Sequence, residues 1–299
     1  MNDTMINTTM LENLADKTMF MSLEFERFGN SRNVDIEANT TANQNRFTHS
    51  KRLLNSPELA EIVKQDSALR VWLDAPNRCW KHGKSIRFVP MHQVEEVWTR
   101  CTDYQDNVRP VLVQAFIDVY LAQIAEAQKD LGPQFDASQY PTLDEVKKEF
   151  DMTFQLLSFS TPEKLKIISP KLYAAEKEKA NELLISAAEE IKAGMRALFQ
   201  EYVAKLLDTL SPSADGKRKR LHKCAVEKLQ TFLSTFDMRN VTDDAELQTE
   251  VGKLKMIMYG VDADKIKESD NLKADLAQRF AEVNVNMLNL VAVKGRKIR

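Results

Sequence analysis

The chain has 299 residues, and its 42 basic and 44 acidic side chains give a formal net charge of -2 at pH 7. This balance argues against a protein that coats nucleic acid by bulk positive charge, but it allows a local basic patch. Only 8 glycines and 9 prolines occur. Such scarcity of chain breakers favours long helices over a strand-rich fold, which needs a turn after every short strand.

Several patterns predict the compartment. No uninterrupted apolar run reaches the roughly 18 residues of a membrane span, so we expect no membrane partner. The first 16 residues lack the basic and apolar regions of a signal peptide. The three cysteines, Cys79, Cys101 and Cys224, are too few and too scattered for a disulfide framework. We therefore expect a cytoplasmic protein.

The N-terminal quarter contains the clearest strand signal. Residues 1–17 are polar and predict a flexible arm. From Met19 to Glu26 apolar and polar side chains alternate, as in a half-buried strand, and Gly29-Asn30-Ser31 supplies a turn. We predict a small β-hairpin at 18–36, followed by a polar loop, so that hairpin and loop together occupy 18–55.

Helical periodicity begins at Ser56-Pro57-Glu58, which fits an N-cap, a first-turn proline and a first-turn acid. Pro110 is expected to kink or divide the helix in which it lies. A further helix is expected from Thr142 to Leu157. The longest helical segment, residues 170–210, would be about 60 Å long. It fits a core helix of a bundle better than a subunit-pairing helix, because its apolar spacing follows 3.6 residues rather than 3.5.

The C-terminal third has its own helices. Ser211 to Gly216 is the clearest linker, and helices are expected at about 218–236, 242–259 and 262–290. We predict a main helical domain at 56–212, a C-terminal helical subdomain at 217–292 and a basic tail at 293–299. The predicted fold class is mainly α, an elongated multi-helix bundle with a small N-terminal β-hairpin.

No catalytic motif is present in the sequence. The phosphate-binding loop, dinucleotide, nucleophile-elbow, zinc-protease and EF-hand patterns are all missing. We therefore predict no catalytic residue and no cofactor. The one weak metal candidate is Cys79, His82, His92 and Cys101, which have ligand types that zinc accepts. The alternative interpretation is buried thiols and surface imidazoles, and the expected metal is none.

A basic segment with interleaved tryptophans is the strongest candidate binding surface. Cations hold phosphates, and exposed aromatic rings stack on unpaired bases. The alternative is that the tryptophans pack between two helices while the charges face water. The candidate residues are Arg70, Trp72, Arg78, Trp80, Lys81, Lys84 and Arg87, with a second patch at Lys217, Arg218, Lys219 and Arg220.

Several segments together resemble a family of bacteriophage and proteobacterial proteins that contain a domain of unknown function. The resemblance covers about residues 15–290 and includes Met21-Ser-Leu-Glu-Phe, Phe28-Gly-Asn-Ser-Arg32, Ser50-Lys-Arg-Leu-Leu54, Ser56-Pro-Glu-Leu59, Gly83 to Pro90, Tyr140-Pro-Thr142 and Met195-Arg196. It implies a helical protein of a bacterial host cell, encoded near MoxR-like AAA+ ATPases and von Willebrand A-type proteins. It implies no catalytic residues.

Three hypotheses follow. The first is a non-enzymatic interaction protein of phage or mobile-element origin that forms homo-oligomers and works with a MoxR-like AAA+ ATPase. The second is a protein that binds single-stranded DNA through the basic segment. The third is an enzyme with a carboxylate or zinc site. We favour the first, and the second is compatible with it.

Overall fold

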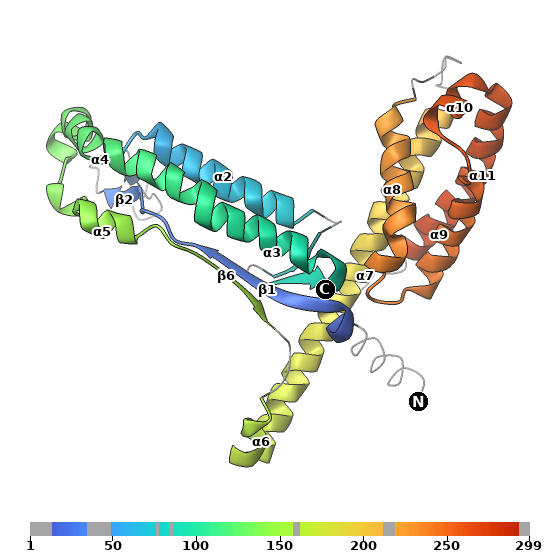
Figure 1. The fold of residues 1–299 in the computed structure, drawn as a ribbon, viewed down its shortest axis with the longest axis horizontal. Helices are drawn as coiled ribbons and strands as arrows, with labels where there is room; N and C mark the ends of the chain where they lie inside the picture. Colours follow the sequence, from blue (N-terminus) through green and yellow to red (C-terminus); the bar gives the residue numbers. More distant parts are fainter. Residues whose placement is uncertain are drawn as a thin grey trace, which may run out of the picture. The chain divides into compact units, whose positions relative to one another are not determined.

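The computed structural model describes residues 14–34, 49–75, 78–83, 86–157, 162–211, 219 and 221–292. It is mainly helical, as expected, with a few short strands (Figure 1). The chain divides into two compact units. Unit 1 contains residues 1–20, 75–94 and 157–299, and unit 2 contains residues 21–74 and 95–156. The predicted basic tail and most of the predicted arm lie outside the described residues.

Unit 2 is built around two long helices. Helix α2 (Pro57–Leu73) begins as predicted, because the Leu59 amide donates to the Ser56 side chain over 3.1 Å. Helix α4 (Arg109–Leu131) packs against α2, and Phe28, Ile62, Phe116 and Tyr120 belong to their shared core. Helix α4 follows α3 (Val94–Asp103) through a π-helical turn, η3 (Tyr104–Val108), which places Pro110 in the first turn of α4.

The strands only partly confirm the predicted hairpin. Strand β1 (Thr18–Phe25) lies within a four-stranded sheet of order β4-β5-β1-β6, with β4 (Trp80–His82) antiparallel to β5 (Ile86–Pro90). Strand β2 (Ser31–Val34) pairs instead with β3 (His49–Arg52), with Ser31 opposite Arg52. The strands differ in burial: half of the residues of β1 are buried, whereas β2 and β3 are polar strands with no buried residue and form a separate ribbon.

The helix expected from Thr142 to Leu157 is wrong beyond residue 148. Helix α5 (Leu143–Lys148) has the capping box of Thr142 and Glu145, but it ends after six residues. Strand β6 (Met152–Leu157) follows, and its side chains alternate between more and less buried positions. Phe150 and Phe154 fit a helical spacing, but residues 152–157 also fit a period of two, and strand pairing decided the outcome.

Short helical turns complete the connections of the first half of the chain. They are η2 (Met91–Gln93), η4 (Gly132–Gln134) and η5 (Ala137–Gln139).

Unit 1 contains the 41-residue helix α7 (Pro170–Leu210), which has the predicted bounds and is capped by Ser169. Around its second half lie α8 (Lys223–Arg239), α9 (Ala245–Ile257) and α11 (Asp270–Ala292), as Figure 1 shows. Their shared core includes Phe199, Phe232, Phe236 and Phe280. The expected helix 262–290 is divided into α10 (Ala263–Glu268) and α11, and the short helix α6 (Lys164–Ile168) precedes α7.

Candidate interaction surfaces

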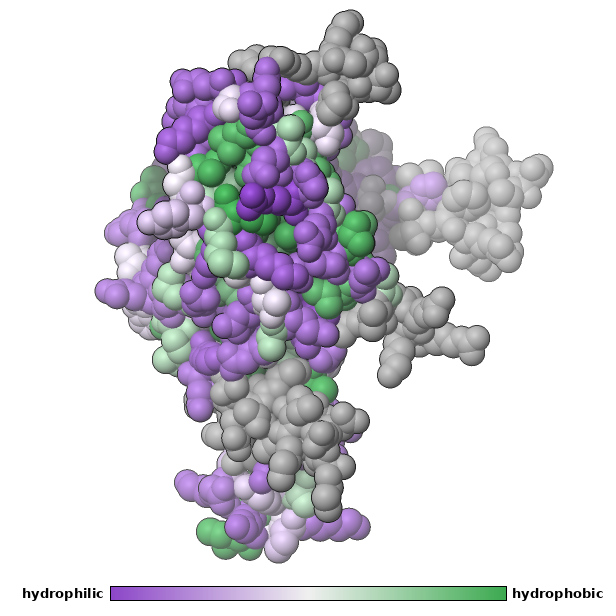
Figure 2. All heavy atoms as spheres, turned by 90° about the vertical axis from the view of Figure 1, so that its right-hand side faces the viewer, coloured by the Kyte–Doolittle hydropathy of each residue, from purple (hydrophilic) through white to green (hydrophobic). Residues whose placement is uncertain are grey.

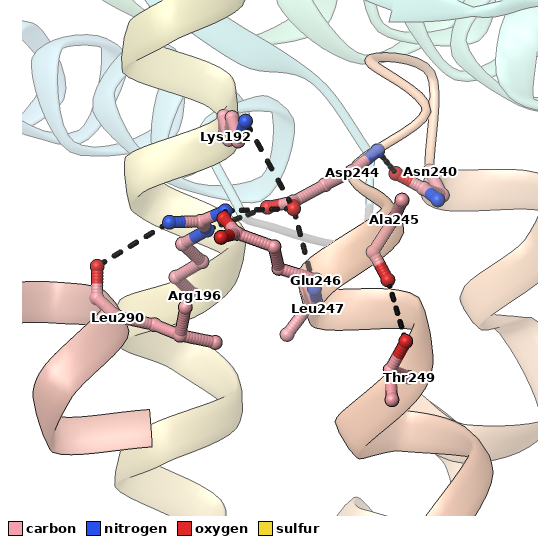
Figure 3. Close-up of polar contacts among 9 residues, drawn as sticks. All are labelled: Lys192, Arg196, Asn240, Asp244, Ala245, Glu246, Leu247, Thr249 and Leu290. Atoms are coloured by element: carbon pink, nitrogen blue, oxygen red, sulfur yellow. Dashed lines mark hydrogen bonds and ion pairs between the residues drawn. The ribbon is translucent and has the colours of Figure 1, made fainter. Parts of the chain in front are cut away.

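A buried ion pair connects three helices of unit 1. Arg196 on α7 binds Asp244 in a bidentate manner, with Nε 2.6 Å from Oδ2 and Nη2 2.8 Å from Oδ1. The same Nη2 also lies 2.5 Å from Glu246 Oε2, and Nη1 donates to the Leu290 carbonyl of α11 over 3.3 Å. Lys192 Nζ is 4.0 Å from Asp244. We call these residues the Arg196 cluster (Figure 3).

The Arg196 cluster also includes the N-cap of helix α9. Asp244 is its N-cap and accepts a hydrogen bond from the Leu247 amide over 3.2 Å. Asn240 accepts the Asp244 amide over 2.8 Å. Because the Asp244 side chain is 1% exposed and both its oxygens are bound, this carboxylate is saturated by structural contacts. The cluster therefore fixes α9 and the last turns of α11 to α7.

A second buried carboxylate lies in unit 2. Asp66 on α2 is fully buried, and its Oδ1 accepts hydrogen bonds from Tyr104 over 2.8 Å and Arg109 over 3.1 Å. Its Oδ2 has no hydrogen-bond partner among the described residues, and Arg27 Nε lies 3.9 Å away. Arg109 also donates to the Glu26 carbonyl over 2.8 Å. We call Asp66, Tyr104, Arg109 and Arg27 the Asp66 cluster.

The Asp66 cluster stabilises the packing of α2 against the π-helical turn and the start of α4. Burial, together with the hydrogen bond to Asp66, raises the pKa of Tyr104 far above its usual range, so this phenol stays protonated as a donor. A surface hollow of about 240 Å³ lies beside Arg109 and is lined by both Lys147 and Asp151.

Helix α11 carries an uncharged surface. Residues 283–292 include no acidic or basic side chain. Val283 and Met287 face the core, whereas Val285 is 55% and Leu288 48% exposed. Figure 2 looks onto the side of the molecule where α11 lies and shows hydrophobic surface between hydrophilic residues. We define the α11 outer face as the exposed apolar residues Ala281, Val285, Leu288, Val291 and Ala292.

Helix α4 has a second apolar surface. The continuous helix Met91–Gln134 is, among the described residues, the one helix long and apolar enough to cross a membrane by length and composition. Only 28% of its apolar window is buried. Val111 is 68% and Leu121 63% exposed. Length and composition alone are weak evidence for a membrane span, and Val111 and Leu121 are exposed apolar side chains on a helix that also exposes Gln114 and Asp118.

A third apolar surface surrounds α6. Ile167 is 87% and Ile168 76% exposed, and Leu172 on the first turn of α7 is 45% exposed. The first third of α7 contributes no buried side chain, and the helix joins the core from Leu183, which is partly buried, and Leu184, which is buried. We call residues 162–173 the α6–α7 tip.

The basic segment predicted to bind DNA is divided between the two units. Arg70 and Trp72 belong to unit 2, where the Arg70 guanidinium lies 4.8 Å from the centre of the Phe25 ring and Arg100 lies 5.9 Å from that of Trp72. Arg78, Trp80, Lys81 and Arg87 belong to unit 1.

Within unit 1, the candidate residues differ in exposure. Lys81 is exposed and Arg78 half-buried, but Arg87 is only 2% exposed. Trp80 packs on the core beside Gly194 of α7, where an added Cβ would lie 3.4 Å from the indole ring. The positions of Trp80 and Arg87 therefore match the packing interpretation of this segment, while DNA binding stays a prediction.

Lys84 of the first segment lies outside the described residues. So does most of the second basic patch, namely Lys217, Arg218 and Arg220. Lys219 is described, and its amine lies 2.5 Å from Asp208 of α7.

The weak zinc candidates are not brought together. Cys79 is buried in unit 1, Cys101 is buried in unit 2, and His82 lies 2.8 Å from Glu190. His92 is exposed. Across the part of the chain that the structure describes, no three His, Cys, Asp or Glu side chains form a group that could hold a metal ion.

Comparison with known proteins does not add to this picture, since no family model, curated protein or solved structure matches the chain.

Proposed function

We propose that this chain is a non-enzymatic interaction protein that self-associates through the α11 outer face. The observation that carries the proposal is the uncharged segment 283–292, which presents apolar side chains both to the core and to solvent. The segment also contains Asn284, Asn286 and Asn289, so it is uncharged rather than wholly apolar. Exposed aliphatic side chains that lie together on one helix face mark a candidate binding surface.

A second copy of the chain is the partner that this surface favours. A two-fold interface brings the same patch of both copies together, so a charged patch would repel itself and an uncharged one does not. Asn284 and Asn289 border the face, and each amide both donates and accepts hydrogen bonds. Asn284 Oδ1 is buried and has no hydrogen-bond partner among the described residues.

The face is small, so we expect weak association. A few half-exposed aliphatic side chains bury less than the roughly 1,200 Å² of a standard interface, which favours dissociation in the micromolar range or above. Sedimentation velocity over about 1 to 100 µM protein tests this, with a mass that rises with concentration as the expected result.

Matched variants connect the association to α11. Leu288→Glu places a charge in the face and should keep the protein monomeric at every concentration. Met256→Glu is the control, because Met256 is 75% exposed on α9, outside the α11 outer face. A wild-type chain that stays monomeric throughout, or a Leu288→Glu variant that associates like the wild type, would contradict the proposal.

The proposal also includes a second protein as a partner, an AAA+ ATPase of the MoxR type. Its support is the family resemblance described above, together with the exposed apolar side chains Val111 and Leu121 of α4, which do not belong to the α11 outer face. Binding of a purified MoxR-like ATPase, measured by biolayer interferometry with and without ATP, tests this part. Leu121→Glu on α4 should weaken the binding, and Leu288→Glu should not.

A further inference from the structure

The α6–α7 tip combines two features that rarely occur together on an exposed surface. Its apolar side chains, Ile167 at 87% and Ile168 at 76%, are almost as exposed as they would be in an unfolded chain. Lys164, Lys166 and Lys171 surround them and are exposed. With Glu163 as the one acid, the tip carries three positive charges and one negative charge, a net charge of +2.

Local contacts hold the tip in shape. The Tyr173 hydroxyl donates to Glu163 over 2.9 Å, and the Lys166 amine lies 5.8 Å from the centre of the Tyr173 ring. Ser169 caps α7 directly after the two isoleucines. The lower end of Figure 2, where α6 and the start of α7 lie in Figure 1, shows hydrophobic residues beside hydrophilic ones. The tip is therefore an ordered apolar projection with a basic border.

The directions of the two isoleucines restrict what can cover them. Successive residues of a helix point about 100° apart, so Ile167 and Ile168 diverge. A partner that covers both must curve or deform around the helix. A lipid interface can, because acyl chains surround a convex projection and anionic headgroups move laterally to meet each lysine. Lysine stems also lie along apolar surface while their amines stay at the headgroup level.

We infer that the α6–α7 tip binds anionic lipid surfaces, with Ile167 and Ile168 inserted at the interface and Lys164, Lys166 and Lys171 at the phosphates. This contact is peripheral and requires no spanning segment. It does not depend on self-association, because none of the tip residues belongs to the α11 outer face.

Cosedimentation of the full chain with vesicles tests the inference. Vesicles of two parts phosphatidylcholine to one part phosphatidylserine should bind the protein, and phosphatidylcholine alone should bind it much more weakly. Each lysine near an anionic surface contributes about fivefold in affinity, so Lys166→Glu and Lys171→Glu should each lose at least about that factor. Ile167→Gln and Ile168→Gln should each lose about tenfold.

Controls separate insertion from nonspecific effects. Met256→Gln removes a side chain that is 75% exposed on α9 and should bind vesicles like the wild type. Raising the salt from about 0.1 to about 1 M shortens the Debye length from about 10 to about 3 Å and should weaken binding. Because both isoleucines are exposed, their variants should keep the wild-type circular dichroism spectrum and melting temperature.

Three outcomes would overturn the inference. They are no binding to phosphatidylserine vesicles, equal binding to neutral vesicles, and wild-type binding by the Ile167→Gln, Ile168→Gln double variant. Binding to a polyglutamate peptide without binding to vesicles would assign the tip to an acidic protein partner instead. None of these results depends on the mass measurements with Leu288→Glu, so the two proposals can fail separately.

Discussion

The Arg196 cluster and the Asp66 cluster both contain a buried aspartate, but they differ in how many of its oxygen atoms accept hydrogen bonds. Each buries an aspartate against an arginine to connect helices far apart in sequence. In unit 1 both oxygens of Asp244 accept hydrogen bonds, and Arg196 also reaches Glu246 and the Leu290 carbonyl. In unit 2 one oxygen of Asp66 has only Arg27, at 3.9 Å.

The two clusters also differ in whether a second basic side chain can replace the arginine. A buried ion pair is costly when one partner is removed, because the remaining charge stays in a medium of low polarity. Asp66 keeps a nearby replacement in Arg27, whose side chain is 28% exposed and can move closer. Asp244 has Lys192 at 4.0 Å, but Arg196 also fixes Leu290 on α11, which Lys192 does not contact. The loss of the arginine is therefore expected to destabilise the protein more in the Arg196 cluster than in the Asp66 cluster.

The largest expected effect is that of Arg196→Met. It leaves Asp244 buried without its bidentate partner and releases the Leu290 carbonyl, so the free energy of unfolding of unit 1 should fall by about 3–5 kcal/mol. Urea denaturation followed by Trp80 fluorescence, in a Trp72→Phe, Trp98→Phe background, reports this unit alone. A loss below about 1 kcal/mol would show that the cluster is not a structural anchor.

The matched change in unit 2 is Arg109→Met. Asp66 keeps the Tyr104 hydroxyl as a donor and gains Arg27, so the free energy of unfolding should fall by only about 1–3 kcal/mol. Trp72 and Trp98 in a Trp80→Phe background report unit 2. Adding Arg27→Met removes this replacement partner of Asp66, so the free energy of unfolding should fall by about 3–5 kcal/mol. If the single and double variants were equally stable, Arg27 would play no part.

The contribution of the Asp244 carboxylate to stability should depend on pH. Burial raises the pKa of Asp244, but hydrogen bonds from Arg196 and the Leu247 amide, with the charges of Arg196 and Lys192, hold it below its usual value. This contribution to stability is complete above the unfolded-state pKa of about 3.9 and is lost as pH falls through the lower folded-state value. The stability difference between wild type and Asp244→Asn should therefore shrink below about pH 4 in urea titrations.

The smallest effect is expected at Asn240, which supports Asp244 in the Arg196 cluster. Asn240 accepts the Asp244 amide and positions the N-cap of α9 without contacting Arg196. Asn240→Ala should lower the free energy of unfolding of unit 1 by about 1 kcal/mol, while Asn240→Asp, which keeps an acceptor, should restore most of it. Equal losses in the two variants would argue against the hydrogen bond as the cause.

Local signals predicted much of the fold, and long-range pairing explains the rest. The bounds of α7 follow from Ser169-Pro170 and a sustained helical period. The partners of β1 could not be read from the sequence, because β5 and β6 are distant in the chain. Arg196 and Asp244 are 48 residues apart, so their pairing carried no local signal.

Asp66 did carry a sequence signal that could have been read. It falls on the apolar stripe of α2, with Ile62 before it and Leu69 after it, and a charge in that position indicates a buried partner. Likewise, Ile167 and Ile168 between lysines already marked a surface that is both apolar and basic. The exposure that makes this segment a binding candidate came only from the structure.

The length of α7 has a mechanical consequence. Its first 13 residues, from Pro170 to Glu182, contribute no buried side chain and advance about 20 Å before Leu183 and Leu184 pack against the core. An uninterrupted helix of this kind acts as a stiff spacer, so anything held at residues 162–173 stays about that far from the α7–α11 core. The same rod continues to Arg196, and a force applied at one end would therefore be felt where α9 begins.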